Sequence, residues 1–305
     1  MNKEGVMKNL ISKPNQDYQL LDSGYGKKLE MIAGIRVERP CPQAIWAPKL
    51  PESEWKKATS ICFRQKDGGG HWKHLKGEPS DLFYHWTNSE DSQLKFKLKL
   101  TSFGHCGIFF EQEPVWDLLT KESLRLKKEL NRQVKFLNLF GYTGGASMAL
   151  AATGAEVFHV DSAKGVLNWG RDNQRQSQLG NQKINFVHQD IREFLKHSIK
   201  KGFKYDGILA DPPSWGHGAN KEVWEFENNI QEFVNDCYKV LTKEKSFFLL
   251  SSHTHGVQQE ALRNVMSQHT CRKILQTGEI GVAHHNEKDE RILPAGIYGF
   301  AHQIC

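Results

Sequence analysis

The apolar and polar residues of the chain follow two different patterns, which change over near residue 110. In residues 94–100, four apolar side chains alternate with Lys95, Lys97 and Lys99. A period of two is typical of a β-strand with one buried face. Runs at 61–64 and 82–86 contain aromatic and β-branched residues and also favour strands. We therefore expect residues 1–104 to form a small β-rich domain.

The row of three lysines on the expected strand at 94–100 has two interpretations. A solvated strand face carries lysines because they discourage pairing with another strand edge. The same row would also suit a track for the phosphate groups of a nucleic acid. We favour the solvated face, because three lysines on one strand are common.

From about residue 114, longer amphipathic stretches alternate with short apolar runs. Residues 115–130 have apolar side chains at helical spacing and predict a helix that leads into a second domain. Strands are then expected at 134–140, 156–160, 184–187, 205–210 and 246–250, and helices at 146–153, 164–178, 191–200 and 223–241. This alternation predicts a doubly wound α/β domain, in which helices cover both faces of a parallel sheet. We assign it to residues 105–305, with two further strands at 279–283 and 297–303.

The composition is that of an ordinary soluble globular protein, with 25% charged and 38% hydrophobic residues. The longest uncharged stretch, 136–155, is as long as a membrane-spanning helix, but glycines and polar residues interrupt it. No secretory signal is visible in the first residues. We therefore expect a cytoplasmic protein without a membrane partner.

The cysteines and the charge distribution narrow the chemistry further. The 6 cysteines are scattered without a CxxC pair or a zinc-ligand spacing, so we expect free thiols and predict no metal site. The formal net charge of +6 is uneven, because residues 1–110 contain 17 Lys and Arg against 12 Asp and Glu. A basic excess in the first third suits a polyanionic partner there.

A glycine-rich segment follows the first strand of the second domain. Residues 138–147 read N-L-F-G-Y-T-G-G-A-S and lie between that strand and the next helix. In a doubly wound sheet, ligands bind beyond the carboxyl ends of the strands, and glycines let the backbone approach a ligand closely. The spacing differs from the G-x-G-x-x-G of dinucleotide-binding proteins, so a plain tight turn is an alternative.

Two acidic residues end the next two expected strands. Asp161 lies 20 residues after Gly141, where a carboxylate can accept hydrogen bonds from both hydroxyls of a ribose. Asp190 ends the following strand, where its side chain would meet the purine of the same nucleoside. Each carboxylate would also suit the N-cap of the helix that follows it.

The fourth strand leads into the most specific motif of the chain, residues 211–215, D-P-P-S-W. Both prolines fix φ and neither offers an N–H, so the carboxylate of Asp211 and the carbonyl of Pro212 would be held as exposed acceptors. With the indole of Trp215 nearby, this arrangement suits a flat heterocycle that carries amino groups. A rigid turn from strand to loop is the alternative.

Together, the segment FGYTGG at 140–145, Asp161, the Asp190 loop and the Asp-Pro-Pro motif at 211–213 resemble the class I S-adenosylmethionine-dependent methyltransferases. The match is similar to the bacterial large-subunit ribosomal RNA methyltransferases that act on cytosine C5 or guanine N7, and it covers about residues 105–305. Residues 107–112 resemble the stretch before the catalytic domain of that family, where a glutamine reaches the cofactor. Residues 1–104 resemble the small β-rich domain that precedes it.

This resemblance implies a Rossmann-like methyltransferase sheet, S-adenosylmethionine as the cofactor, and RNA, in particular large-subunit ribosomal RNA, as the partner. The cofactor-binding residues that it implies are Gln112, Asn138, Phe140, Gly141, Tyr142, Thr143, Gly144, Ala146, Asp161, Ser162 and Asp190. The implied catalytic residues are Asp211, Pro212, Pro213 and Trp215.

Two departures from the family pattern bear on the chemistry. Asn138 stands where many class I enzymes have an acidic residue, so no contact with the methionine amino group is assigned to it. Methylation at cytosine C5 needs a thiolate nucleophile, but the segment that would carry it, residues 250–253, reads L-S-S-H. We therefore expect direct in-line transfer to a ring or exocyclic nitrogen. His253 and His255 flank this loop and would accept a proton, touch phosphate, or simply lie on the surface.

Two other functions fit parts of the sequence. An NAD(P)-dependent oxidoreductase uses the same kind of sheet, but the dinucleotide fingerprint is absent and Asp-Pro-Pro has no role in hydride transfer. A catalytically inactive RNA-binding protein that retains the fold would explain the missing cysteine, but the cofactor-type residues argue against it. The sequence names neither the methylated base nor the oligomeric state.

Overall fold

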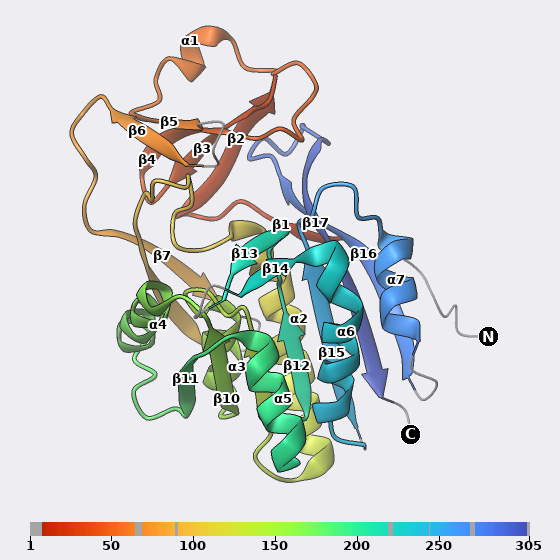
Figure 1. The fold of residues 1–305 in the computed structure, drawn as a ribbon. Coiled ribbons are helices and arrows are strands. Elements are labelled where there is room, and N and C mark those ends of the chain that lie inside the picture. The colour runs from red at the N-terminus through yellow and green to blue at the C-terminus, as the bar shows by residue number, and fades with distance from the viewer. Residues whose placement is uncertain are drawn as a thin grey trace.

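The computed structural model describes residues 8–64, 69–88, 91–218, 222–243, 245–268 and 272–303. Its largest element is an eight-stranded sheet with helices on both faces (Figure 1). In spatial order the strands are β1 (Leu10–Ser12), β16 (Arg272–Ala283), β17 (Ile292–Gln303), β15 (Ser246–Ser252), β12 (Gly207–Ala210), β9 (Lys135–Leu139), β10 (Glu156–Asp161) and β11 (Ile184–His188). The strands from β15 to β11 are parallel, and β17 is antiparallel to both of its neighbours. The predicted doubly wound α/β fold is therefore confirmed.

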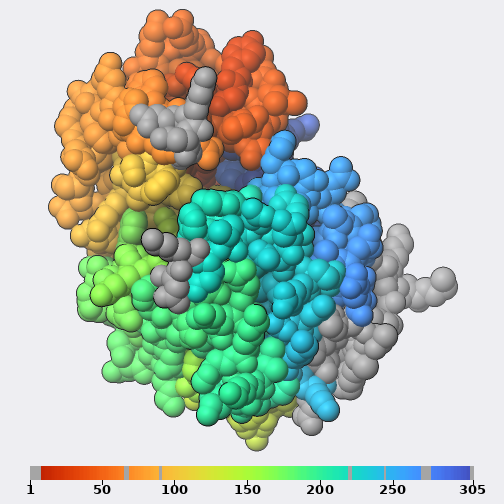
Figure 2. All heavy atoms as spheres, in the orientation of Figure 1, coloured from red at the N-terminus to blue at the C-terminus, as the bar shows by residue number. Residues whose placement is uncertain are grey.

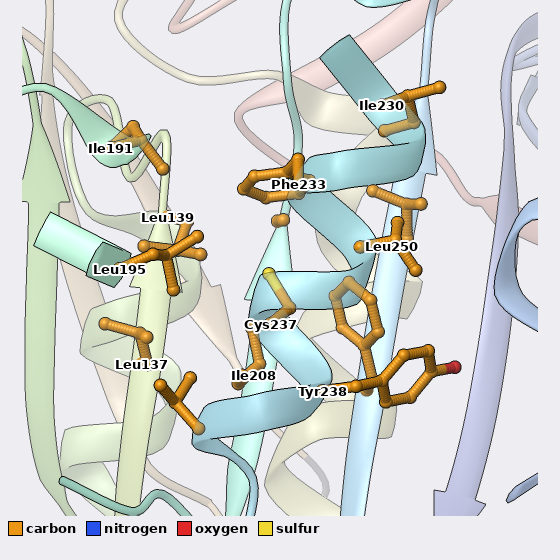
Figure 3. Packing of buried hydrophobic residues seen from close by; sticks show 14 of the residues in the cluster. Leu137, Leu139, Ile191, Leu195, Ile208, Ile230, Phe233, Cys237, Tyr238 and Leu250 are labelled. Atoms are coloured by element: carbon orange, nitrogen blue, oxygen red, sulfur yellow. The ribbon is translucent and has the colours of Figure 1, made fainter. Parts of the chain in front are cut away.

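Helices cover the two faces of this sheet in separate groups. The helices are α2 (Glu113–Leu130), α3 (Gly145–Ala152), α4 (Lys164–Gln176), α5 (Ile191–Lys201), α6 (Phe226–Val240) and α7 (Gln259–Ser267). Side chains of α2 and α3 share one buried cluster with the sheet, and side chains of α5, α6 and α7 share another. In the second cluster, Phe233 and Cys237 of α6 pack over Ile208 and Leu250 of the sheet (Figure 3). Removing these apolar side chains from water is the main force that holds the layers together.

The order of the strands reverses at β9. The chain passes from β9 outward to β10 and β11, then returns to β12 on the other side of β9. Leu139 at the end of β9 is in register with both Val160 of β10 and Ala210 of β12. The loops that follow these three strands therefore meet at one edge, which is where doubly wound sheets bind ligands.

A second, five-stranded sheet lies beyond the carboxyl ends of the parallel strands (Figure 1). Its strands are β2 (Tyr18–Gly24), β3 (Lys27–Ile32), β4 (Ile35–Pro40), β5 (Ser60–Arg64) and β6 (Gly70–His74), and the short helix α1 (Glu52–Trp55) precedes β5. A separate hairpin of β7 (Leu82–Thr87) and β8 (Gln93–Leu98) leads back to the large domain. Figure 2 shows the residues near 100, in yellow, between the small sheet and the large domain.

The first strand of the chain departs from the expected split at residue 104. β1 precedes the small sheet in sequence, yet it pairs in parallel with β16 at the edge of the large sheet. The tip of the β16–β17 hairpin in turn reaches the small sheet, where Arg291 forms a 2.8 Å ion pair with the buried Asp22. The division into residues 1–104 and 105–305 stays a prediction, with the two regions joined by these contacts.

Two local expectations need correction. The helix expected at 223–241 begins at Phe226, because β14 (Val223–Glu225) forms a hairpin with β13 (Trp215–His217). The row of lysines is solvated only in part, because Lys95 and Lys97 of β8 are half-buried, whereas Lys99, which follows the strand, is exposed. Lys95 Nζ lies 4.0 Å from the centre of the Phe83 ring, and Lys99 Nζ lies 5.2 Å from that of Trp169. Two of the three ammonium groups thus rest on aromatic rings.

The described cysteines are free thiols, as expected. Cys41, Cys62, Cys106 and Cys237 are all buried, while Cys271 and Cys305 lie outside the described residues. Within the described ranges, no helix is both long enough and apolar enough to cross a bilayer.

Candidate functional site

The glycine-rich segment after β9 makes a tight left-handed path. Phe140 (φ 57°), Tyr142 (φ 51°) and Gly144 (φ 91°) all have positive φ. A Cβ on Gly141 would lie 2.4 Å from the buried ring of His159, so the loop can press against the sheet only with glycine at this position. The segment is therefore more than a plain turn, because it brings main-chain atoms to the carboxyl edge of the sheet.

A buried hydrogen-bond chain supports this loop from below. The amide of Asn138 donates to Ser147 Oγ at 2.8 Å, and Ser147 Oγ lies 2.9 Å from His159 Nδ1. His159 Nε2 lies 3.2 Å from the carbonyl oxygen of Tyr142, and burial lowers the pKa of His159 to about 4. Asn138 therefore positions the loop through Ser147 and a neutral imidazole. Ser147 and His159 were not predicted as functional residues, because no recognised motif marks them.

Asp161 lies at the end of β10 and closes the loop from the side. Its Oδ2 accepts a hydrogen bond from the Tyr142 amide and its Oδ1 from the Ala163 amide, both at 2.9 Å. Burial raises its pKa, while these amide donors favour the charged form. Each carboxylate oxygen can accept a further hydrogen bond, so capacity remains for the two hydroxyls of a ribose.

Asp190 has the helix-capping geometry that was one of its two expected roles. Its Oδ1 accepts hydrogen bonds from the amides of Arg192 (2.9 Å) and Glu193 (3.3 Å) at the start of α5. Its side chain also lines a small cavity of about 50 Å³ beside Asp161. Contact between Asp190 and a purine stays a prediction.

This small cavity lies where a doubly wound sheet binds the nucleoside part of a ligand. Its walls come from the ends of β9, β10, β11 and β12, including Phe140, Ser162, Ile191 and Pro213. Apolar side chains flanked by hydroxyl and carboxylate groups are the lining that a flat adenine ring and its ribose require. The hairpin of β13 and β14 lies against the cavity, because Ser162 Oγ donates to the His217 carbonyl at 3.2 Å.

Three polar side chains converge on Asp211 at the end of β12. Ser251 Oγ donates to Asp211 Oδ1 at 2.8 Å, and His253 Nε2 lies 3.2 Å from the same oxygen. Gln112 Nε2 lies 3.4 Å from Asp211 Oδ2 and 3.3 Å from His253 Nε2. The other ring nitrogen of His253 bonds to the carbonyl of Ala295. Gln112 thus lies beside Asp211 and buttresses the expected catalytic loop.

The Asp211–His253 pair is held in its charged form. Removal from solvent opposes ionisation of both groups, but each partner stabilises the charge of the other. The pKa of Asp211 is lowered by the imidazolium and by the hydrogen bonds from His253 and Ser251. The carboxylate of Asp211 raises the pKa of His253 to about 10. His253 is therefore a cation at neutral pH, which excludes it as a proton acceptor in this state.

The other predicted residues lie around the glycine loop and the Asp211 cluster. Trp215 is 57% exposed, and its ring makes a T-shaped contact with that of His217. The Pro213 carbonyl accepts a hydrogen bond from Trp224 Nε1 at 2.7 Å, and Pro212 is buried. Thr143 is buried and donates to the Gly107 carbonyl. Ala146 is half-buried on α3, and His255 is exposed.

An aromatic wall joins the glycine loop to the Asp211 cluster. The ring of Phe109 lies 5.3 Å from that of Tyr142 and 6.2 Å from that of His253. Among the residues that the structure describes, no group of three or more His, Cys, Asp or Glu side chains is arranged to hold a metal ion. The site therefore consists of a small cavity at the strand ends, a main-chain loop and a carboxylate with a cationic neighbour.

Known proteins place this arrangement in a family. A family model described as S-adenosylmethionine-dependent methyltransferase matches residues 39–233. The chain belongs to the S-adenosylmethionine-dependent methyltransferases. It uses S-adenosylmethionine as its methyl donor. The family assignment replaces the oxidoreductase alternative.

A solved structure supports the assignment over nearly the whole chain. The S-adenosylmethionine-dependent methyltransferase of Agrobacterium tumefaciens is 29% identical and superimposes with a TM-score of 0.87, over 97% of this chain and 93% of that one. The structure of SMU.776 in complex with SAH has the same fold, with a TM-score of 0.71 at 16% identity over 95% of this chain and 76% of that one.

Curated relatives are named after an RNA substrate but are much longer. Ribosomal RNA large subunit methyltransferase K/L of Colwellia psychrerythraea is 26% identical over 220 residues, which is 71% of this chain and 28% of that protein. The protein of the same name from Shewanella sp. strain MR-4 is 33% identical over 130 residues, or 42% of this chain and 17% of that protein. This chain thus spans less than a third of either relative.

Proposed function

We propose that this methyltransferase transfers the methyl group of S-adenosylmethionine to a nitrogen of a base in ribosomal RNA, in particular that of the large subunit. The observation that carries the proposal is the ionised Asp211, held by Ser251 and His253 at the carboxyl end of β12. A fixed carboxylate beside a methyl-donor site suits a base that presents N–H groups. The names of the relatives and the basic excess of residues 1–110 support RNA as the source of that base.

A nitrogen acceptor agrees better with the side chains of the site than cytosine C5 does. Attack on the pyrimidine ring during C5 methylation requires a thiolate. At the end of β15 the chain has Ser251, whose hydroxyl donates to Asp211 instead of serving as a nucleophile. Cys237 is buried in the core between α6 and the sheet (Figure 3), where burial raises the pKa of its thiol.

The residues of the chain have three tasks in this proposal. Asp161 orients the ribose of the donor, which supplies an electrophilic methyl group when bound. Asp211 accepts hydrogen bonds from the acceptor base and aligns its nitrogen for in-line attack, while Trp215 offers its exposed face for stacking. Gln112 and His253 fix the carboxylate, so that little reorganisation is needed during transfer.

Transfer of labelled methyl groups to unmodified large-subunit ribosomal RNA, followed by nucleoside analysis, tests this function and identifies the base. We expect Asp211→Asn to bind S-adenosylmethionine within about twofold of the wild type and to lose at least about 100-fold in transfer rate. Wild-type protein that binds the cofactor but labels no RNA would contradict the substrate. Full transfer by Asp211→Asn would contradict the role of the carboxylate.

A further inference from the structure

A cavity of about 170 Å³ lies between the small sheet and the segment that leads into α2. Its walls come from β3, β4, β5 and β6 on one side and from residues 103–111 on the other. The basic side chains that line it are Lys28, Arg39, Arg64 and His105, and the acidic one is Glu111. The cavity is distinct from the smaller one beside Asp161 that suits the cofactor.

The charges around this cavity favour an anion. Arg39 is buried and is held by both carboxylate oxygens of Glu30 at 2.6 and 2.7 Å, and Lys28 Nζ lies 3.1 Å from the same carboxylate. Arg64 forms no ion pair with any other residue of the described ranges. Three cations therefore line the cavity opposite one carboxylate, Glu111, while Glu30 lies behind the wall.

His105 responds to this positive environment. Its pKa is lowered to about 4, first because neighbouring side chains partly desolvate the ring and then because of the charges of Arg39, Arg64 and Lys28, although the residue remains exposed at the surface. The imidazole is therefore neutral, although it lies beside several groups that can donate to an anion. A bound anion would offset the neighbouring cations and raise the pKa of His105.

The cavity adjoins the methyl-acceptor site. Phe109 lines the cavity and also stacks on His253, which binds Asp211. The ring of His105 lies 6.4 Å from that of Tyr142 in the glycine loop. At the rim, Phe103 is 65% exposed. Cationic side chains beside an accessible aromatic ring are the combination by which proteins bind single-stranded nucleic acids.

On the basis of the proposed RNA substrate, we propose that this cavity binds a backbone phosphate next to the methylated nucleotide, with Arg64 and Lys28 as its ligands. An enzyme that acts on an extruded base must also hold the strand on either side of it. Phosphate contacts fix the register of the strand without reading its sequence. The small sheet thereby contributes directly to substrate binding, and Phe103 provides a stacking surface for the neighbouring base.

The test compares Arg64→Gln with a control, Lys76→Gln. The control removes the same charge from an exposed residue that follows β6 of the small sheet and does not line the cavity. The probe is an unmodified large-subunit ribosomal RNA transcript. We expect Arg64→Gln to weaken RNA binding about five- to tenfold, to reduce the slope of log affinity against log salt by about 0.7, and to raise KM for RNA at unchanged kcat. Affinity for S-adenosylmethionine should not change in either variant.

The outcomes separate this inference from the proposed function. Wild-type protein that neither binds nor methylates the transcript refutes both. If the wild type methylates the transcript but Arg64→Gln and Lys76→Gln bind it with equal affinity, the phosphate site in the cavity is refuted and the proposed function is not. As a second readout, a short oligoribonucleotide should raise the pKa of His105 measured by NMR, and an unchanged pKa on saturation with the oligonucleotide would overturn the placement of the phosphate.

Discussion

The Nε2 atom of His253 lies 3.2 Å from Oδ1 of Asp211, and this contact joins the ends of two neighbouring parallel strands. Asp211 follows β12 and His253 follows β15, so the sheet itself sets the distance between them. The carboxylate raises the pKa of His253 to about 10, and the imidazolium in turn keeps Asp211 ionised. Asp211 therefore stays ionised throughout the neutral range.

Replacing His253 by Gln should make methyl transfer sensitive to acid. The variant keeps a hydrogen-bond donor but loses the positive charge, so the pKa of Asp211 should rise. Because the folded-state pKa of His253 is about 10, the wild type keeps this charge from pH 5 to 9, whereas the variant should lose activity toward pH 5. Single-turnover rates across this range measure the effect. Ser251→Ala removes a neutral hydrogen-bond donor that also lowers the pKa of Asp211, so it should shift the profile less than His253→Gln does. Equal profiles for His253→Gln and the wild type would contradict the role of the charge.

Asp161→Ala should weaken the binding of S-adenosylmethionine by about ten- to 100-fold. Hydrogen bonds to a charged group contribute about 1.5–3 kcal/mol each, and the substitution also frees the Tyr142 amide that shapes the glycine loop. Calorimetric titration measures the affinity. Asp172→Ala on the exposed surface of α4 is the matched control and should bind as the wild type does. If Asp161→Ala bound S-adenosylmethionine with wild-type affinity, the role of Asp161 in cofactor binding would be contradicted.

Gly145→Ala should destabilise the protein at the start of α3. A Cβ there would lie 2.3 Å from the ring of Trp116, which is buried and packs against Trp86 at 5.5 Å. Overpacking of this kind costs about 1–3 kcal/mol. Gly165→Ala in α4, whose Cβ would meet nothing within 4 Å, should be neutral or slightly stabilising. Thermal unfolding of the two variants without cofactor measures the difference. Equal Tm values would show that the Trp116 ring can move away from the new Cβ without loss of stability.

Glu113→Gln should stabilise the protein at alkaline pH but not at acidic pH. Glu113 accepts a 3.0 Å hydrogen bond from Asn15, and burial raises its pKa from 4.5 to about 8. Between these values the unfolded chain has released a proton that the folded chain still holds, so the stability contributed by Glu113 falls as pH rises. Glutamine does not ionise, so the variant should not lose this stability as the pH rises. The Tm of the variant relative to the wild type should therefore increase from pH 5 to pH 9, and a constant difference would contradict the shifted pKa.

Local sequence patterns predicted much of the fold because each depends on neighbouring residues only. The alternation of apolar runs and amphipathic stretches located the strands from β9 to β15 and the helices between them. The motif at 211–213 was recognisable because two consecutive prolines restrict the main chain whatever surrounds them. The exception, the helix expected from residue 223, began later because Trp224 pairs with the opposite strand β13.

The parts of the site that were missed depend on contacts between distant segments. Nothing in the pattern near Ser147 indicates that its hydroxyl lies between Asn138 and His159. Gln112 was predicted from the resemblance as a cofactor-binding residue, but its hydrogen bond to Asp211 was not predicted. Hydrogen-bond partners of this kind are selected by the packing of elements, which a local pattern does not contain.

The sequence by itself determined the order of strands and helices, the glycine loop and the carboxylates at the strand ends, since periodicity and main-chain restriction are properties of short segments. Only the tertiary structure decided that β1 joins the far edge of the large sheet, that His253 is a cation beside Asp211, and that Arg64 and Lys28 share a cavity with residues 103–111. These relationships arise because strand pairing, burial and charge proximity are set in three dimensions, where residues far apart in the chain remove one another from water.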